Sequence, residues 1–101
     1  MSVEIYSVNF TRLARLELIE AQDWYEGEVT GLGRRFRNAV DELVERMSSN
    51  PRQFPVVYKN IRRALLHRFP YSLFFVVNGE TLLIIACFHA SRDPVHWQDR
   101  I

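Results

Sequence analysis

The sequence lacks the features that mark secreted and membrane proteins. Its 101 residues include one cysteine, Cys87, which cannot form an internal disulfide. No apolar run approaches the roughly 18–20 residues of a membrane-spanning helix. The N-terminal stretch MSVEIYSVNF has neither the basic start nor the apolar core of a signal peptide. Apolar residues make up 48% and charged residues 25%, as in ordinary soluble proteins. These absences predict a cytoplasmic protein that does not bind membranes.

The chain is also too short for a large interior. Its length fits one domain, 1–101. A chain of this size buries roughly 60–65% of the surface that it exposes when unfolded. We therefore expect one core and little room for a deep, enclosed substrate cavity.

Charge is distributed unevenly although the net charge is only +1. Residues 1–50 carry six arginines and nine acidic residues, for a net charge of −3. Residues 51–101 carry six arginines, one lysine and three acidic residues, for a net charge of +4. Such asymmetry fits a basic face for an anionic partner, but it also fits solvated helices beside a basic sheet.

The N-terminal half predicts a short strand followed by two helices. Residues 3–9 alternate in polarity like a strand, and Asn9 or Thr11 is a candidate N-cap for the helix that follows. In segments 10–29 and 32–49, apolar residues recur at spacings of four, three and four, which predicts one apolar helix face in each. These stripes are Ala14, Leu18, Ala21 and Tyr25, then Phe36, Val40, Leu43 and Met47. The glycine-containing stretch 27–33 predicts the loop between the helices.

The C-terminal half predicts a sheet. Segments 54–58, 62–69, 71–77 and 81–89 have strand character, and Asn78-Gly79 between the last two is a strong hairpin signal. The last two segments are apolar at nearly every position, which is typical of central strands. The predicted fold class is α+β: an antiparallel sheet with an N-terminal strand and a two-helix hairpin packed on one face, in the order β-α-α-β-β-β or with a fourth strand after the helices.

The stretch CFHASRDPVHW, residues 87–97, gathers polar residues that could carry chemistry. His89 and His96 are seven residues apart with Asp93 between them, and structural zinc sites prefer tighter pairs, so we expect no metal. Ser91, His89 and Asp93 are too close in sequence to form the hydrogen-bonded chain of a catalytic triad.

Acid–base cleavage of RNA is a more serious possibility. Attack by the 2′-hydroxyl requires a base, an acid and cations near the phosphate. The groups able to supply them are His67, His89, Arg62, Arg63, Arg68, Arg92 and Tyr71. The histidines near strand ends could equally hydrogen-bond to backbone, and the basic groups of 62–69 fall on both sides of the predicted strand. They could form a docking face or protect an edge strand from aggregation.

The C-terminal segment HASRDPVHWQDR has a simpler interpretation as a folded-back tail. Pro94 would fix a turn, and Trp97 would bury much of its ring against the sheet. Arginine and tryptophan are also favoured at protein interfaces.

Several motifs occur in a recognisable order along the chain. They are WYE, LGRRF, NPRQFPVV, RRALLHRFPYSLFFVV and CFHASRDPVHWQDR. In this order they resemble the ParE branch of the RelE/ParE toxins of bacterial type II toxin–antitoxin systems, over nearly the whole chain from about Ala14 to Arg100. The resemblance implies a cytoplasmic toxin that requires no cofactor. Its partner would be a cognate antitoxin whose disordered C-terminal segment folds on the toxin surface.

The resemblance implies either of two targets. ParE-like members inhibit DNA gyrase by binding and are not enzymes, whereas RelE-like members cut mRNA on the ribosome. The FPY motif and the tail pattern His89, Arg92, Pro94 and Trp97 are similar to the ParE branch. Only four residues follow Trp97, with no terminal Tyr or His for RNA cleavage. Lys59 is the single lysine, whereas the ribosomal nucleases tend to be lysine-rich.

These considerations give three functional hypotheses. The leading one is a gyrase inhibitor whose target-binding residues are Arg62, Arg63, Arg68, His89, Arg92, Trp97 and Arg100. The expected antitoxin-binding residues are Trp24, Tyr25, Leu32 and Phe36. All four could instead belong to the core, and for Tyr25 and Phe36 the core is the better interpretation. The alternative is a ribosome-dependent mRNA endonuclease with Arg62, Arg68, Tyr71 and His89 as catalytic residues. The third is a non-toxic module that binds antitoxin.

Overall fold

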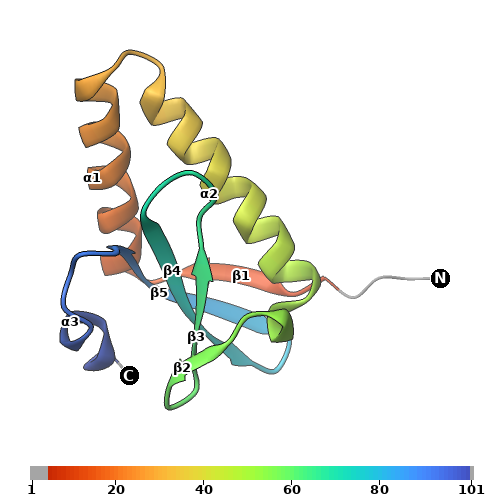
Figure 1. The fold of residues 1–101 in the computed structure, drawn as a ribbon. Coiled ribbons are helices and arrows are strands. Elements are labelled where there is room, and N and C mark those ends of the chain that lie inside the picture. The colour runs from red at the N-terminus through yellow and green to blue at the C-terminus, as the bar shows by residue number, and fades with distance from the viewer. Residues whose placement is uncertain (1–4, 101) are drawn as a thin grey trace.

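The computed structural model describes residues 5–100. Strand β1, Ser7–Phe10, is followed by helices α1, Arg12–Glu28, and α2, Leu32–Ser49. A 3₁₀ helix, Pro51–Gln53, leads into strands β2, Val56–Tyr58, β3, Ile61–Leu65, β4, Tyr71–Asn78, and β5, Thr81–His89. The short helix α3, Val95–Gln98, ends the chain's regular structure. The two long helices form a hairpin against the sheet, and α3 lies apart from α2 (Figure 1).

The sheet has the order β1-β5-β4-β3-β2. Neighbouring strands from β2 to β5 are antiparallel, but β1 pairs in parallel with β5, Ser7 opposite Thr81 and Phe10 opposite Ile84. The predicted α+β fold with its helical hairpin is confirmed, and the prediction of an antiparallel sheet is corrected to a mixed one. A period-two pattern reveals a strand but not its direction, which depends on where the helices return the chain.

Both predicted helix faces are confirmed. Ala14, Leu18 and Ala21 are buried on α1, and Phe36, Val40, Leu43 and Met47 are buried on α2. They form the main core with the face of the sheet that carries Ala64, Leu73, Phe75 and Leu82. Thr11 is the N-cap of α1, since its hydroxyl accepts a hydrogen bond from the Ala14 N–H at 3.1 Å.

The ends of α1 and β3 differ from the predicted boundaries. Helix α1 continues through Gly27 to Glu28, so the loop between the helices is shorter than expected. Strand β3 ends at Leu65 rather than Phe69, because Arg68 adopts a left-handed conformation with φ of 69°. The reversal returns Phe69 to the helix side of the sheet, where it packs against the core. The predicted N-terminal strand began at Val3, which lies outside the described residues.

The helices meet most closely at Gly33. The carboxylate of Glu26 accepts hydrogen bonds from the Gly31 N–H at 2.9 Å and from the Gly33 N–H at 3.0 Å, and so caps the start of α2. A Cβ on Gly33 would lie 2.9 Å from the Gln22 carbonyl oxygen and from the Glu26 side chain. The hairpin therefore requires glycine at this position.

Gly33→Ala is expected to lower the free energy of unfolding by about 1–3 kcal/mol, because the helices must separate and the Glu26 cap is disturbed. Gly27→Ala is the matched control. It lies within α1, and its added Cβ would meet nothing within 4 Å. It is expected to raise stability by up to about 1 kcal/mol through helix propensity. Urea denaturation measures both, and equal effects of the two substitutions would contradict the close contact.

Candidate functional site

The face of the sheet opposite the helical hairpin is covered in part by the C-terminal tail, residues 90–100. Trp97 is buried and stacks on Phe74, with ring centroids 4.2 Å apart and planes 20° apart. These rings join Ile61, Ile85, Ala86 and Phe88 in a second apolar cluster. The tail is therefore folded back onto the sheet, as the sequence predicted, and its residues form part of the neighbouring surface.

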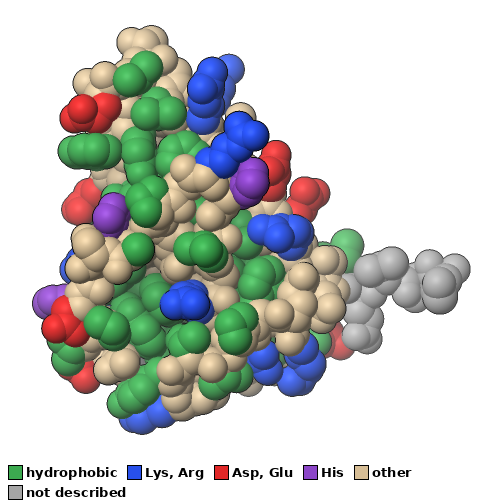
Figure 2. Space-filling model, viewed as in Figure 1, with side chains coloured by type: hydrophobic (Ala, Val, Ile, Leu, Met, Phe, Trp, Pro, Cys, Tyr) green, Lys and Arg blue, Asp and Glu red, His purple; other side chains and the backbone are tan. Residues whose placement is uncertain are grey.

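A shallow cavity of about 240 Å³, here called the tail pocket, lies beside Trp97. It is lined by Val57, Arg63, Leu65, Ser72, Phe74, Phe88, His89, Ala90, Arg92, Pro94 and Trp97. The lining contains two arginines and no carboxylate. Two large apolar side chains of the lining are exposed, Leu65 at 60% and Val57 at 38%. Figure 2 shows hydrophobic side chains gathered on the lower part of the molecule around a basic one.

The two arginines of the tail pocket are held differently. Arg63 is exposed on β3 and makes no ion pair with another described residue. Arg92 lies with its guanidinium carbon 3.9 Å from the Phe88 ring centroid and its side chain 44% exposed. Both can offer hydrogen-bond donors to an anionic or carbonyl-rich partner.

Two of the predicted target-binding arginines are engaged within the fold. Arg62 points to the helix side of the sheet, where its guanidinium donates to the Phe54 carbonyl at 2.6 Å. Arg100 donates to both carboxylate oxygens of Glu17 at 2.8 Å and to the Ile85 carbonyl at 2.9 Å. Its side chain is 15% exposed. The structure therefore does not place Arg62 and Arg100 on the same open surface as Arg63.

Glu17 is the residue that sequence reasoning missed. It comes three residues after Ala14 and four before Ala21, so it borders the buried stripe of α1. That spacing is the signal in the sequence that could have identified Glu17. Its side chain is 9% exposed.

The predicted nuclease residues are not gathered. Tyr71 and His89 are adjacent, with ring centroids 5.2 Å apart, and burial raises the pKa of Tyr71. His89 Nδ1 accepts from the Ser91 N–H at 3.0 Å. Arg62 lies opposite Phe75 in the β3–β4 register, and Phe75 is four residues along β4 from Tyr71. Arg62 is therefore roughly 13 Å along the strand from Tyr71. Arg68 lies in the β3–β4 loop, where its Nε donates to His67 Nε2 at 3.3 Å.

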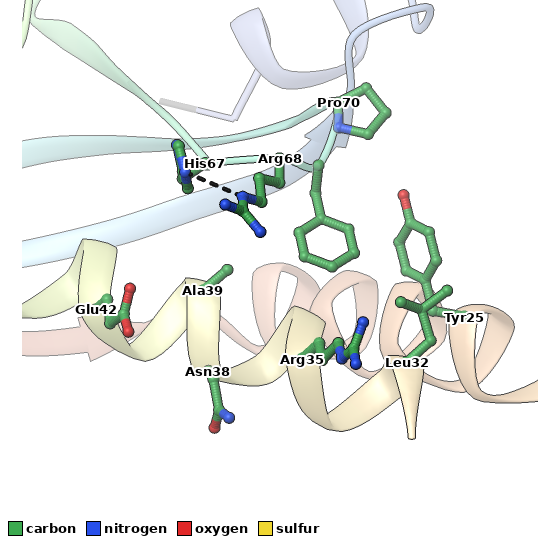
Figure 3. A pocket seen from close by; sticks show the side chains of 10 residues that line it. Tyr25, Leu32, Arg35, Asn38, Ala39, Glu42, His67, Arg68 and Pro70 are labelled. Atoms are coloured by element: carbon green, nitrogen blue, oxygen red, sulfur yellow. Dashed lines mark hydrogen bonds between the residues drawn. The ribbon is translucent and has the colours of Figure 1, made fainter. Parts of the chain in front are cut away.

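A larger concavity of about 650 Å³ lies between α2 and the β3–β4 loop; we call it the α2 groove (Figure 3). It is lined by Tyr25, Leu32, Arg35, Asn38, Ala39, Glu42, His67, Arg68, Phe69 and Pro70. Arg68 extends from the loop toward α2 (Figure 3). The groove thus combines an apolar end at Tyr25, Leu32 and Phe69 with two arginines against one carboxylate.

The four predicted antitoxin-binding residues separate into three environments. Tyr25 and Leu32 line the α2 groove, and burial raises the pKa of the Tyr25 hydroxyl. Phe36 is fully buried and stacks on Tyr25, with ring centroids 5.2 Å apart. Trp24 is 59% exposed and lies outside the groove, in a concavity shared with Tyr71 and His89.

Within residues 5–100, no three His, Cys, Asp or Glu side chains are grouped so that they could hold a metal ion. Burial and, to a lesser extent, Glu17 raise the pKa of the Cys87 thiol to about 12, so this thiol is a poor nucleophile. In the same part of the chain, no helix has the length and hydropathy to cross a bilayer.

Two solved structures and one protein family are similar to this chain. A chain of the chromosomal ParDE system from P. aeruginosa is similar with a TM-score of 0.71 and 23% identity, covering 85% of this chain and 97% of that one. A chain of the RelBE2 toxin–antitoxin complex from Mycobacterium tuberculosis is similar with a TM-score of 0.61 and 21% identity, covering 84% and 98%. No curated protein sequence matches. Residues 8–94 match the family described as the ParE toxin of the type II toxin–antitoxin system parDE. The chain therefore belongs to the ParE toxin family.

Proposed function

We propose that this toxin arrests growth by binding DNA gyrase through the tail pocket, without catalysing a reaction. The observation that carries the proposal is the composition of the pocket. Its rim has Arg63 and Arg92, and its floor has the rings of Phe74, Phe88 and Trp97. An apolar floor bordered by arginines is typical of a protein-binding hot spot.

The arrangement of the polar residues supports binding rather than cleavage. General acid–base chemistry needs its groups within hydrogen-bond reach of one phosphate. Tyr71 and His89 meet each other, but Arg62 is engaged by Phe54 and Arg68 lies at the α2 groove. The mRNA endonuclease therefore remains the second candidate function, because of its four expected catalytic residues only Tyr71 and His89 lie next to each other.

The α2 groove supports an antitoxin partner. ParDE and RelBE2, the systems similar in fold, are toxin–antitoxin systems. We propose that an extended or helical segment of a cognate antitoxin lies in the groove, with an apolar side chain at Tyr25 and Leu32 and a carboxylate near Arg35 and Arg68. Helix-in-groove recognition uses this combination of apolar anchors and charged margins.

Gyrase supercoiling measured with the purified protein tests the target. The wild type is expected to inhibit supercoiling, and Arg63→Gln is expected to raise the inhibitory concentration about 5- to 30-fold, because an interface arginine contributes about 1–2 kcal/mol. Arg52→Gln is the matched control, since Arg52 is equally exposed but lines neither concavity.

A translation assay run in parallel separates the alternatives. Cleavage of mRNA on ribosomes, with gyrase unaffected, would establish the endonuclease and refute the gyrase proposal. Harmless expression of the wild type without antitoxin would instead favour the non-toxic binding module.

A further inference from the structure

The tail makes few hydrogen bonds to the rest of the fold. Its first residue, Ala90, donates its N–H to the Pro70 carbonyl at 2.8 Å. Within the part of the chain that the structure describes, residues 91–100 form hydrogen bonds outside segment 89–100 only to the Glu17 carboxylate and the Ile85 carbonyl. One carboxylate on α1 therefore accounts for most of the polar attachment of the tail.

Glu17 accepts hydrogen bonds from three residues, one on β5 and two in the tail. Its Oε1 accepts from the Cys87 N–H at 3.1 Å and from Arg100 Nη1 at 2.8 Å. Its Oε2 accepts from Arg100 Nη2 at 2.8 Å and from Arg92 Nη1 at 3.5 Å. The Arg100 contact is bidentate, which fixes direction as well as distance.

The sheet topology explains why a carboxylate lies there. Strand β1 pairs with β5 only as far as Ile84. Beyond that residue β5 still pairs with β4, but its other edge, on the β1 side, has no strand partner among the described residues. The Glu17 side chain supplies an acceptor to the Cys87 N–H, and Arg100 supplies a donor to the Ile85 carbonyl. Buried backbone groups must be paired, so the ion pair also completes this edge.

Arg92 lies beside this pair, with its Nη1 3.5 Å from Glu17 Oε2. The guanidinium carbons of Arg92 and Arg100 are 3.9 Å and 4.9 Å from the centroid of the Phe88 ring, and Phe88 forms part of the floor of the tail pocket. Without the Glu17 carboxylate, neither arginine would have an ion-pair partner among the described residues. We propose that Glu17 is a positioning residue, which holds the tail on the sheet and so places Arg92 and Trp97 for target binding. This inference rests on the proposed function of the tail pocket.

The test uses Glu17→Gln, which keeps the shape of the side chain and removes its charge, with Glu20→Gln as control. Glu20 is exposed one turn along α1 and forms no ion pair with a described residue. Amide hydrogen exchange is expected to be at least tenfold faster at Cys87 and Trp97 in Glu17→Gln, and unchanged at Phe75 and Ile84 in the main core. The inhibitory concentration for gyrase is expected to rise at least tenfold. Both readouts are expected to stay at wild-type values in Glu20→Gln.

A double-mutant cycle separates positioning from general destabilisation. In an Arg92→Gln background, Glu17→Gln is expected to raise the inhibitory concentration by much less than in the wild type, because one of the two residues it positions is already absent. Equal effects in the two backgrounds, unchanged tail exchange, or a loosened tail with full inhibition would each overturn the inference. Should Glu17→Gln fail to fold, Arg100→Gln removes the same pair from the tail side.

The two proposals fail in different ways. A wild type that leaves gyrase active refutes the proposed target, whereas the exchange experiment still decides whether Glu17 holds the tail.

Discussion

Replacing Phe36 with alanine is expected to lower the free energy of unfolding by about 3–5 kcal/mol. The ring is fully buried between the helices and the sheet. It contacts Tyr25, Phe69 and Tyr71, with centroids between 5.2 and 5.3 Å away. Truncation would remove apolar contacts on all sides and leave a cavity that the rigid hairpin cannot close. Urea denaturation monitored by far-UV circular dichroism measures the effect.

The same substitution distinguishes a core residue from an interface residue. From the sequence, Phe36 fits either the antitoxin interface or, better, the core, and its burial indicates that it supports the groove from below. Arg68→Glu is the contrasting variant, because Arg68 lines the α2 groove without contributing to the core. It is expected to weaken antitoxin binding about tenfold while stability changes by less than about 0.5 kcal/mol. A Phe36→Ala protein with full stability and selective loss of antitoxin binding would contradict this assignment.

Stability is expected to fall steeply above pH 9 because of Cys87. Burial is the main cause that raises the pKa of its thiol from 9.0 to about 12 in the folded protein. The unfolded chain therefore loses this proton from about pH 9, while the folded protein keeps it until about pH 12. Between these values the free energy of unfolding decreases by up to about 1.4 kcal/mol per pH unit, which gives a loss of about 3 kcal/mol at pH 11.

Cys87→Ala tests the origin of that loss. The variant is expected to show a shallower decline between pH 9 and 11 in urea unfolding. Burial also raises the pKa values of Tyr25 and Tyr71, so a residual decline in the same direction is expected. A decline of wild-type steepness in Cys87→Ala would show that the thiol is not responsible.

The fold was largely predictable because its elements obey strong local rules. The stripes of α1 and α2 and the hairpin turn at Gly79, with its φ of 60°, depend on residues close together in the sequence. The end of β3 was misplaced because a left-handed Arg68 has no local signal. The direction of β1 was missed because a four-residue strand reveals nothing about its neighbour.

The site was less predictable because it depends on contacts between distant segments. Alternation along β3 correctly separated Arg62 from Arg63, but it could not indicate which side the tail would cover. The tail pocket requires Trp97 to reach Phe74 across the sheet. Glu17 forms hydrogen bonds with residues 70 or more positions away, and no pattern within α1 predicts which residues those are.

The parallel pairing of β1 with β5 has a consequence for biosynthesis. Ser7 pairs with Thr81, so 74 positions of chain separate the first strand from its neighbour. A ribosome releases the N-terminal segments first, and non-local strand pairs form slowly. The helical hairpin consequently emerges before the surface that buries its apolar stripe exists. Nascent chains halted before residue 81 are expected to remain protease-sensitive, and protection would appear only when β5 leaves the exit tunnel.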